Sequence, residues 1–326
     1  MFSYILLFIL AAFLISPKQE NLIKKYFYAI ALTSSVFAYN FLGLISLILI
    51  SISNSRFPIL LLSLSFLLST IFIDKKNIKN KFIYLKNSLI SELIFSVNYL
   101  KNKSKKIILI IIFLLFCLIT ISSIGPINHP DSLDYHVGYP YQYWLKGKFF
   151  IDGGLHQALL GIGDYANLSF IQENNIWLIR YLQIITLPII CLFLINKIKD
   201  KFFILVLLSS PVIIQWSTIG KPLFLGESAL AIAYLIWKEN QDKFSKNLLL
   251  FCIFSCISLK ISSLIVIFPI AIDIIVQALK QSKKINLRLL LKDELEAIFC
   301  SKLTIISIII LCSIFISRQI ISGNFL

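Results

Sequence analysis

Acidic, imidazole and aromatic side chains gather in one stretch of the sequence, residues 125–176. It contains all three histidines of the chain and four aspartates. Its first part reads His-Pro-Asp-Ser-Leu-Asp-Tyr-His from residue 129. A carboxylate here can act as a general base, and a neighbouring imidazole can carry a proton. We therefore expect residues 125–176 to carry the chemistry of this protein, with an ordinary polar loop as the plain alternative.

Asp131 is the first candidate for this base, and Asp134 competes with it. Pro130 prevents the preceding helix from continuing, and the spacing after it predicts a short helix with Asp131 as its N-cap. In that helix Asp131, Asp134 and Tyr135 share one face. A purely structural cap at Asp131 is the alternative, and the two roles are compatible.

Three basic residues outside this stretch are candidates to bind an anionic group: Lys221, Lys260 and Arg318. Cationic side chains can hold a phosphate and offset its negative charge. Lys260 interrupts a long apolar run, and a charge at such a place usually faces a cavity. For each of the three, the alternative is that a long side chain only reaches from a membrane to its aqueous boundary.

A metal ion is a further question for the same stretch. His129, Asp131, Asp134 and His136 are close in sequence, so a divalent cation stays open as a cofactor. A specific arrangement such as His-Glu-x-x-His is missing, and no metal ligand is assigned.

The elements that must position these residues are apolar helices. Hydrophobic residues make up 58% of the chain, charged residues 14%, and the mean hydropathy is +0.87. A soluble domain carries about 25% charged residues. The long uncharged runs do not alternate as β-barrel strands do, so they predict an all-α polytopic transmembrane bundle of about ten helices. The runs fall at 2–15, 26–53, 57–73, 107–124, 177–195, 202–217, 223–237, 247–259, 261–279 and 303–321.

Two of these segments leave alternatives open. The 26–53 run is long for one span, and Asn40 with Gly43 could mark a kink in it. Segment 74–106 mixes lysines with apolar residues. It is either a helix that lies on an anionic leaflet or a solvated linker.

The lysines predict the orientation of the bundle. Their clustering between apolar runs is typical of a topology signal, and it argues against nucleic-acid binding despite the net charge of +15. Placing 74–106 in the cytoplasm also places the other Lys-rich segments there, namely 17–25, 196–201, 238–246 and 280–302. The outer side then receives 54–56, 125–176, 218–222, the turn at Lys260 and the C-terminus.

Here a family resemblance appears. Asp131-Ser132-Leu133-Asp134-Tyr135-His136-Val137, followed by Tyr-Trp-Leu-Lys-Gly from residue 143, resembles the first external loop of GT-C superfamily membrane glycosyltransferases. More narrowly, it resembles the bacterial branch related to protein O-mannosyltransferases and aminoarabinose transferases. The stretch from Ser217 to Pro222 resembles their second external loop, although Leu223 stands where an Asp is common and Glu227 could substitute for it.

The resemblance covers about residues 107–326, with 1–106 as an added helical section that includes the basic cytoplasmic segment. It implies transfer of a sugar from a polyprenyl-phosphate donor to a cell-envelope glycan or lipid acceptor, on the outer face of the cytoplasmic membrane. Asp131 or Asp134 would be the base, and Tyr135 and His136 would contact substrate. The stretch from Arg318 usually continues into further helices, so a C-terminally shortened member is expected. A transporter or flippase of a lipid-linked or anionic substrate is the alternative, as is an inactive envelope assembly protein.

Overall fold

The structure is a computed structural model that describes residues 1–100, 103–124, 132–148, 150, 157, 160–197, 206–281 and 302–322. Every regular element among these residues is a helix, which confirms the all-α prediction. The elements are α1 (Phe2–Ile15), α2 (Glu20–Ser51), α3 (Ile59–Ile73), α4 (Lys75–Leu100), α5 (Lys103–Ile124), the π-helical turn η1 (Ser132–His136), α6 (Gly138–Lys146), α8 (Ile162–Gln172), α9 (Leu178–Ile184), α10 (Thr186–Lys197), α12 (Pro211–Thr218), α13 (Leu223–Asn240), α14 (Lys243–Leu259), the 3-10 turn η2 (Ile261–Ser263), α15 (Leu264–Gln281) and α17 (Lys302–Ser322).

Helix α2 is the centre of the bundle. It is one continuous helix of 32 residues that packs against α1, α8, α13 and α14. The helix continues through Asn40 and Gly43 without interruption, and both residues make contacts between helices. Asn40 donates a hydrogen bond of 3.3 Å to the carbonyl of Ser255. A Cβ atom at Gly43 would lie only 2.1 Å from the carbonyl oxygen of Ile162, so the glycine lets α8 approach α2 closely.

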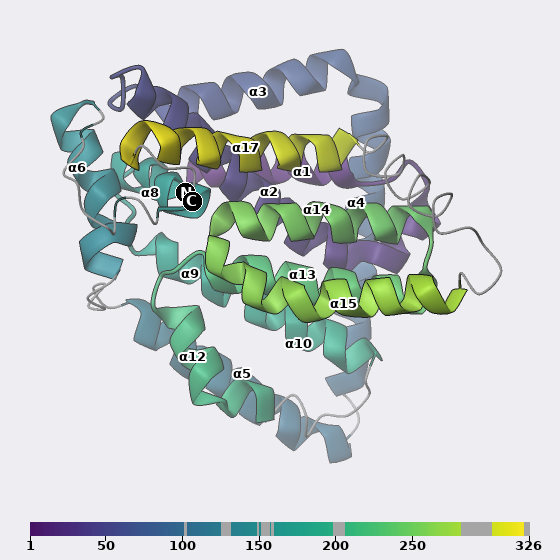
Figure 1. The fold of residues 1–326 in the computed structure, drawn as a ribbon. Coiled ribbons are helices and arrows are strands. Elements are labelled where there is room, and N and C mark those ends of the chain that lie inside the picture. The colour runs from purple at the N-terminus through teal and green to yellow at the C-terminus, as the bar shows by residue number, and fades with distance from the viewer. Residues whose placement is uncertain are drawn as a thin grey trace.

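One hydrophobic core joins the first helices to the rest of the chain. Buried residues of α1 and α2 form a single cluster with those of α8, α13 and α14. In Figure 1, α1, α13, α14, α15 and α17 run in roughly the same direction, while α5 and α12 lie apart from them. Packing is therefore continuous across residues 106 and 107, where the resemblance begins, and the division at that point stays a prediction.

Two helical segments in the described part of the chain are long and apolar enough to cross a membrane, by length and composition alone. They are Glu20–Ser51 and Leu178–Ile195, and most of each is buried inside the bundle. A buried core helix of a soluble protein can have the same properties. Four further apolar helical stretches of the described residues, of 10 to 17 residues each, are shorter than the roughly 20 residues that a simple span needs: Phe2–Ile15, Ile59–Ile73, Ile261–Gln277 and Thr304–Ile316. The count of about ten spans stays a prediction.

Two apolar runs are divided by the structure. The run at 177–195 forms α9 and α10, with a turn at Ile185 between them. In the run at 202–217, α12 begins only at Pro211, a residue that fits the first turn of a helix but not its interior.

The two ends of the bundle differ in chemistry. At one end Lys25 lies 3.5 Å from Asp242, and the hydroxyl of Tyr26 donates to the same carboxylate. This contact brings together 17–25 and 238–246, two segments assigned to one side of a membrane from their lysines. At the other end Glu173 accepts hydrogen bonds from the backbone N–H groups of Phe2 (2.9 Å) and Ser3 (3.0 Å), so residues from 125–176 hold the start of α1.

Candidate functional site

The described part of residues 125–176 is tied to the turn between α2 and α3. The hydroxyl of Ser55 donates to the carbonyl of Tyr143 at 2.6 Å. The side chain of Gln172 donates to the carbonyls of Ser55 and Phe57 and accepts from the N–H of Ile59 at 3.1 Å. Segments 54–56 and 125–176 were both assigned to the outer side from the sequence, and they meet at this end of the bundle.

The centre of this end is the carboxylate of Asp164, which has no exposure to solvent. One carboxylate oxygen contacts Nδ1 of His136, which is equally buried. The other lies 3.9 Å from the ammonium of Lys260 and accepts a hydrogen bond of 2.8 Å from the N–H of Gly161. We call Asp164, His136 and Lys260 the buried triad.

Close backbone approach brings the members of the triad together. Lys260 follows the last residue of α14 with an extended backbone, and Gly161 precedes the first residue of α8. A Cβ atom at Gly161 would lie 2.0 Å from the carbonyl oxygen of Leu259, so only glycine lets these two helix ends meet in this way. Asp164 sits one turn into α8, where its carboxylate also satisfies an amide at the helix start.

His136 is fixed by a second set of hydrogen bonds. Its backbone carbonyl accepts from the side-chain amide of Asn167 at 2.7 Å. The amide oxygen of Asn167 in turn accepts from the hydroxyl of Tyr39, at 2.6 Å, on α2. Asn167 and Tyr39 are fully buried. The imidazole therefore has a position set by α8 and α2 as well as by its own turn.

The buried triad has a defined charge state. Burial lowers the pKa of His136 below its usual 6.5, and the attraction of Asp164 does not fully offset this effect. Burial alone would raise the pKa of Asp164, but Lys260, His136 and the Gly161 N–H together lower it. At neutral pH Asp164 is therefore a carboxylate and His136 a neutral imidazole. The contact with Asp164 assigns the ring proton to Nδ1 and the lone pair to Nε2.

Two further cations belong to the same end. Lys221 lies close enough to His136 to lower its pKa, as Lys260 does. The next residue, Pro222, packs on the start of α8, since a Cβ atom at Gly163 would meet its ring at 2.6 Å. Arg180 is 5% exposed, and its side chain passes beside Gly220.

The predicted site residues are thus placed unequally. The structure brings His136, Lys221 and Lys260 to one place, while Asp134 is exposed on the same turn as His136. Tyr135 belongs to η1 and Arg318 to α17, but their side chains are outside the described residues. Asp131 lies outside them altogether, so its predicted N-cap role and its place beside the cations stay predictions.

Asp164 and Arg180 are the site residues that the sequence reasoning missed. Asp164 was one of four aspartates in the loop, and Arg180 stood at the start of an apolar run. The signal for Asp164 was its neighbourhood: Gly-Ile-Gly-Asp followed by apolar residues predicts a buried helix start, where a carboxylate needs partners.

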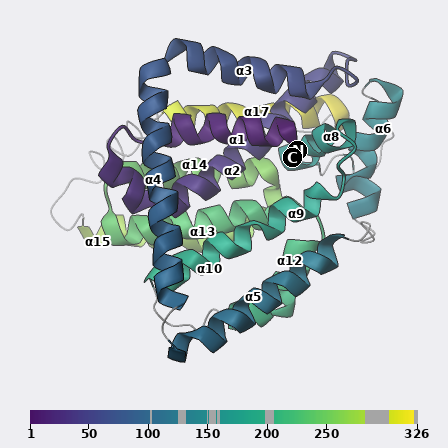
Figure 2. The same cartoon turned by 180° about the vertical axis from the view of Figure 1, so that it is seen from behind.

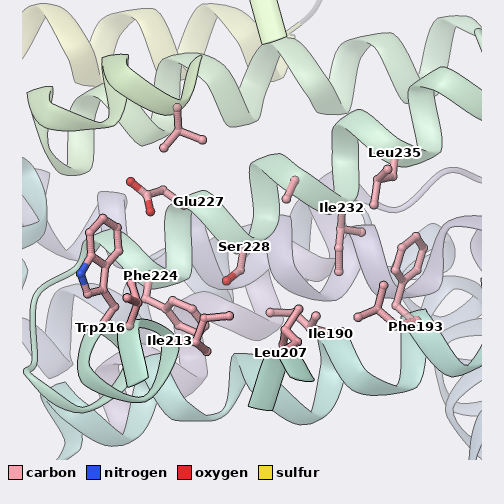
Figure 3. A pocket seen from close by; sticks show the side chains of 14 residues that line it. Ile190, Phe193, Leu207, Ile213, Trp216, Phe224, Glu227, Ser228, Ile232 and Leu235 are labelled. Atoms are coloured by element: carbon pink, nitrogen blue, oxygen red, sulfur yellow. The ribbon is translucent and has the colours of Figure 1, made fainter. Parts of the chain in front are cut away.

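An apolar groove runs along the bundle from this end. It has a volume of about 520 Å³ and is lined by residues of α10, α12, α13 and α15. Figure 3 shows Trp216, Phe224 and Glu227 toward one end of the groove and Phe193 and Leu235 toward the other. Apart from Glu227, Ser228 and the Trp216 indole, the lining is hydrocarbon. Such a groove can hold a long apolar chain.

Among the described residues, no three His, Cys, Asp or Glu side chains come together as a metal site. No protein-family model matches the chain, and no curated protein or solved structure is significantly similar to it. The site is therefore interpreted from its own geometry and from the motif in residues 131–137.

Proposed function

We propose that this chain is a membrane glycosyltransferase that moves a sugar from a polyprenyl-phosphate donor to a cell-envelope acceptor. The observation that carries the proposal is the place of Lys221. It acts electrostatically on His136 in the buried triad, and it is three residues from Phe224 in the lining of the apolar groove. A cation that acts on the polar cluster and stands just before a helix lining a hydrocarbon groove matches a ligand with a phosphate head and a long apolar chain.

The donor would lie with its prenyl chain in the groove and its phosphate at Lys221. The carboxylate of Asp164 lies 3.9 Å from the ammonium of Lys260 and offsets much of its charge. Lys260 would therefore act on the phosphate at longer range, from the interior side of the site. Arg318, expected on the same side, would complete the set. Cations placed where negative charge develops stabilise the departing phosphate, and they act most strongly where water is excluded.

The reaction needs a base on the open side of this cluster. Asp134 is exposed and two residues from His136, and Asp131 precedes it in the same motif. In the transfer step the carboxylate takes the proton of the acceptor hydroxyl or amine. The acceptor oxygen or nitrogen forms a bond to the anomeric carbon of the sugar, the bond from that carbon to the phosphate oxygen breaks, and polyprenyl phosphate leaves with the electron pair.

The proposal also sets a location. The end of the bundle that contains the buried triad would lie on the outer side of the cytoplasmic membrane. The end with Lys25 and Asp242 would lie on the inner side. The bundle would cross the membrane about ten times, with the shorter apolar helices tilted or enclosed by the others.

A transfer assay tests this function. Purified full-length protein in nanodiscs would be given a radiolabelled polyprenyl-phosphate sugar and an extract of envelope acceptors. Lys221→Met should reduce transfer roughly 10- to 100-fold, because a hydrogen bond to a charged group contributes about 1.5–3 kcal/mol. The matched control is Lys243→Met, an exposed lysine at the opposite end of the bundle, which should leave transfer unchanged.

Blocking the groove gives an independent arm. Ala231 lines it, and Ala231→Trp should weaken donor use, whereas a short-chain water-soluble donor should be affected less. Equal transfer by wild-type protein, Lys221→Met and Ala231→Trp would exclude the proposed donor site. Movement of a labelled lipid-linked sugar across the bilayer, without transfer, would instead support the transporter alternative.

A further inference from the structure

Helix α4 is oriented differently from the helices it touches. Figure 2 shows it crossing the ends of α1, α2, α10 and α13 at a steep angle, from α3 to α5. Its packing partners are α1, α2, α3 and α5. If the bundle crosses a bilayer, a helix in this position lies along the bilayer surface.

One side of α4 is committed to the bundle. Ser88 is 1% exposed, and Glu92 accepts from the hydroxyl of Tyr28 on α2. The ammonium of Lys81 donates to the carbonyl of Phe13, at 2.6 Å, in the last turn of α1. Burial lowers the pKa of Lys81, and this contact places its positive charge at the negative end of the α1 dipole. These contacts fix which side of α4 faces outward.

The outward side carries six large apolar residues with no cover among the described residues. They form two parallel stripes with the same spacing of seven and then four residues, which keeps each stripe on one side of a helix. Their exposed fractions are between 41% for Ile83 and 58% for Phe82. The stripes are Phe82, Leu89 and Leu93, and Ile83, Ile90 and Ile94.

Lysines stand among these apolar residues. Lys75, Lys79 and Lys86 are all exposed. Acidic residues are fewer than lysines here: Asp74 directly precedes α4, and Glu92 lies within it and accepts a hydrogen bond from Tyr28. A partner for this face must therefore be apolar in part and negatively charged in part.

Other lysines at this end of the bundle are paired with carboxylates: Lys24 lies 2.8 Å from Glu20, and Lys25 lies 3.5 Å from Asp242. Lys24 and Lys25 lie at the start of α2, and Tyr28, the partner of Glu92, lies one turn further along that helix. A protein–protein interface would be a poor match, because the cores of such interfaces are depleted of lysine. A leaflet of anionic lipid fits both features, since lysine stems cover hydrocarbon while their ammonium groups reach phosphates.

We infer that α4 is a membrane-surface helix whose outward face binds an anionic lipid leaflet. Phe82, Ile90 and the other four apolar residues enter the boundary between headgroups and acyl chains. Lys75, Lys79 and Lys86 bind the negatively charged headgroups. The inference rests on the membrane placement within the proposed function, and it adds a lipid class and a binding surface to it.

A depth measurement on the full chain tests this surface. In a variant whose six cysteines are replaced, a fluorescent label would be attached at Ile90→Cys and, separately, at Ser91→Cys. Ser91 is exposed but lies about 100° further round the helix, so it is the matched control. In nanodiscs, the Ile90 label should be quenched several-fold more by lipids with brominated chains than the Ser91 label is, and it should be protected from aqueous iodide.

Headgroup charge is the second arm. Quenching at Ile90 should be stronger in nanodiscs that contain phosphatidylglycerol than in phosphatidylcholine alone. The combined substitution Lys75→Glu, Lys79→Glu and Lys86→Glu should remove this difference. Thermal unfolding should show that this variant is still folded.

A third label separates this inference from the proposed membrane placement. Phe268 on α15 is 68% exposed on the side of the bundle, and a label at Phe268→Cys should be quenched by the same lipids. Quenching at Phe268 with iodide access at Ile90 would overturn the surface role of α4 alone. An Ile90 label shielded from both quenchers would also overturn it, in favour of a second copy or another protein. No lipid quenching at either position would remove the membrane placement itself.

Discussion

The carboxylate of Asp164 holds Nδ1 of His136 in the interior of the bundle, where neither side chain is exposed. The two residues come from different elements of residues 125–176, so their contact fixes the turn η1 against α8. A carboxylate that orients an imidazole also determines which nitrogen carries the proton. His136 is therefore a positioning residue in this proposal, with its Nε2 turned away from Asp164.

The first prediction concerns the charge of Asp164. Asp164→Asn keeps the volume of the side chain but removes the negative charge that lies 3.9 Å from the ammonium of Lys260. Removing one partner of a buried ion pair typically costs about 3–5 kcal/mol, so the Tm of the purified protein should fall by several degrees. Asp74→Asn is the matched control, because Asp74 is exposed and lies outside the candidate site, so this change should alter stability by less than about 0.5 kcal/mol. Equal Tm values for the two variants would contradict the role of Asp164.

The second prediction is a dependence of stability on pH. Burial lowers the pKa of His136 below 6.5, so the unfolded chain binds a proton more readily than the folded one. The contribution of the neutral His136 ring to the free energy of unfolding is fully present above pH 6.5. It is lost as the pH falls toward the lowered pKa of the folded state. Thermal unfolding of wild-type protein should show a decrease in Tm over this range, and His136→Gln should flatten it. The pKa of Asp164 is also lowered, so its contribution disappears only below its usual 3.8.

The third prediction concerns the crossing of α2 and α8. Gly43→Ala would place a methyl group against the carbonyl of Ile162, a backbone atom that cannot move aside. We expect a loss of about 1–3 kcal/mol, measured as a lower Tm, together with lower transfer activity, because α8 carries Asp164. Ser46→Ala on the same helix is the control. Its hydroxyl is buried without a hydrogen-bond partner among the described residues, so its removal should be neutral or stabilising.

The fourth prediction concerns the N-cap of α14. Asp242 accepts a hydrogen bond of 2.8 Å from the N–H of Ser245 and another from the hydroxyl of Tyr26. Asp242→Ala should cost about 1 kcal/mol in stability. Lys243→Ala changes an exposed side chain in the same turn and should not. Burial, the largest single effect, raises the pKa of Asp242, but its hydrogen bonds and Lys25 together outweigh burial and lower it. The difference in stability between Asp242→Ala and wild-type protein should therefore shrink in acid.

Sequence patterns predicted the helical class and the grouping of polar segments at one end. Apolar periodicity and lysine placement are local signals, and these features depend on little else. The buried triad is different, because Asp164 and Lys260 come together where Gly161 lets the start of α8 approach the end of α14, and His136 reaches them from a separate turn. The sequence alone does not show that a Cβ atom at Gly161 would lie 2.0 Å from the carbonyl oxygen of Leu259, because that contact joins two helices that are far apart in the chain. For the same reason Asn40 and Gly43 suggested a bend, although the structure uses them for contact between helices.

The hydrogen bonds around His136 also set an order in which the site can be built. Tyr39 is synthesised early, Asn167 and Asp164 much later, and Lys260 later still, yet all of them belong to one network of contacts around His136. During synthesis the loop with Asp134 therefore precedes the last of its supports by more than a hundred residues. A ribosome-bound chain that ends before Lys260 therefore contains Asp164 without the ammonium group that lies 3.9 Å from it in the folded protein.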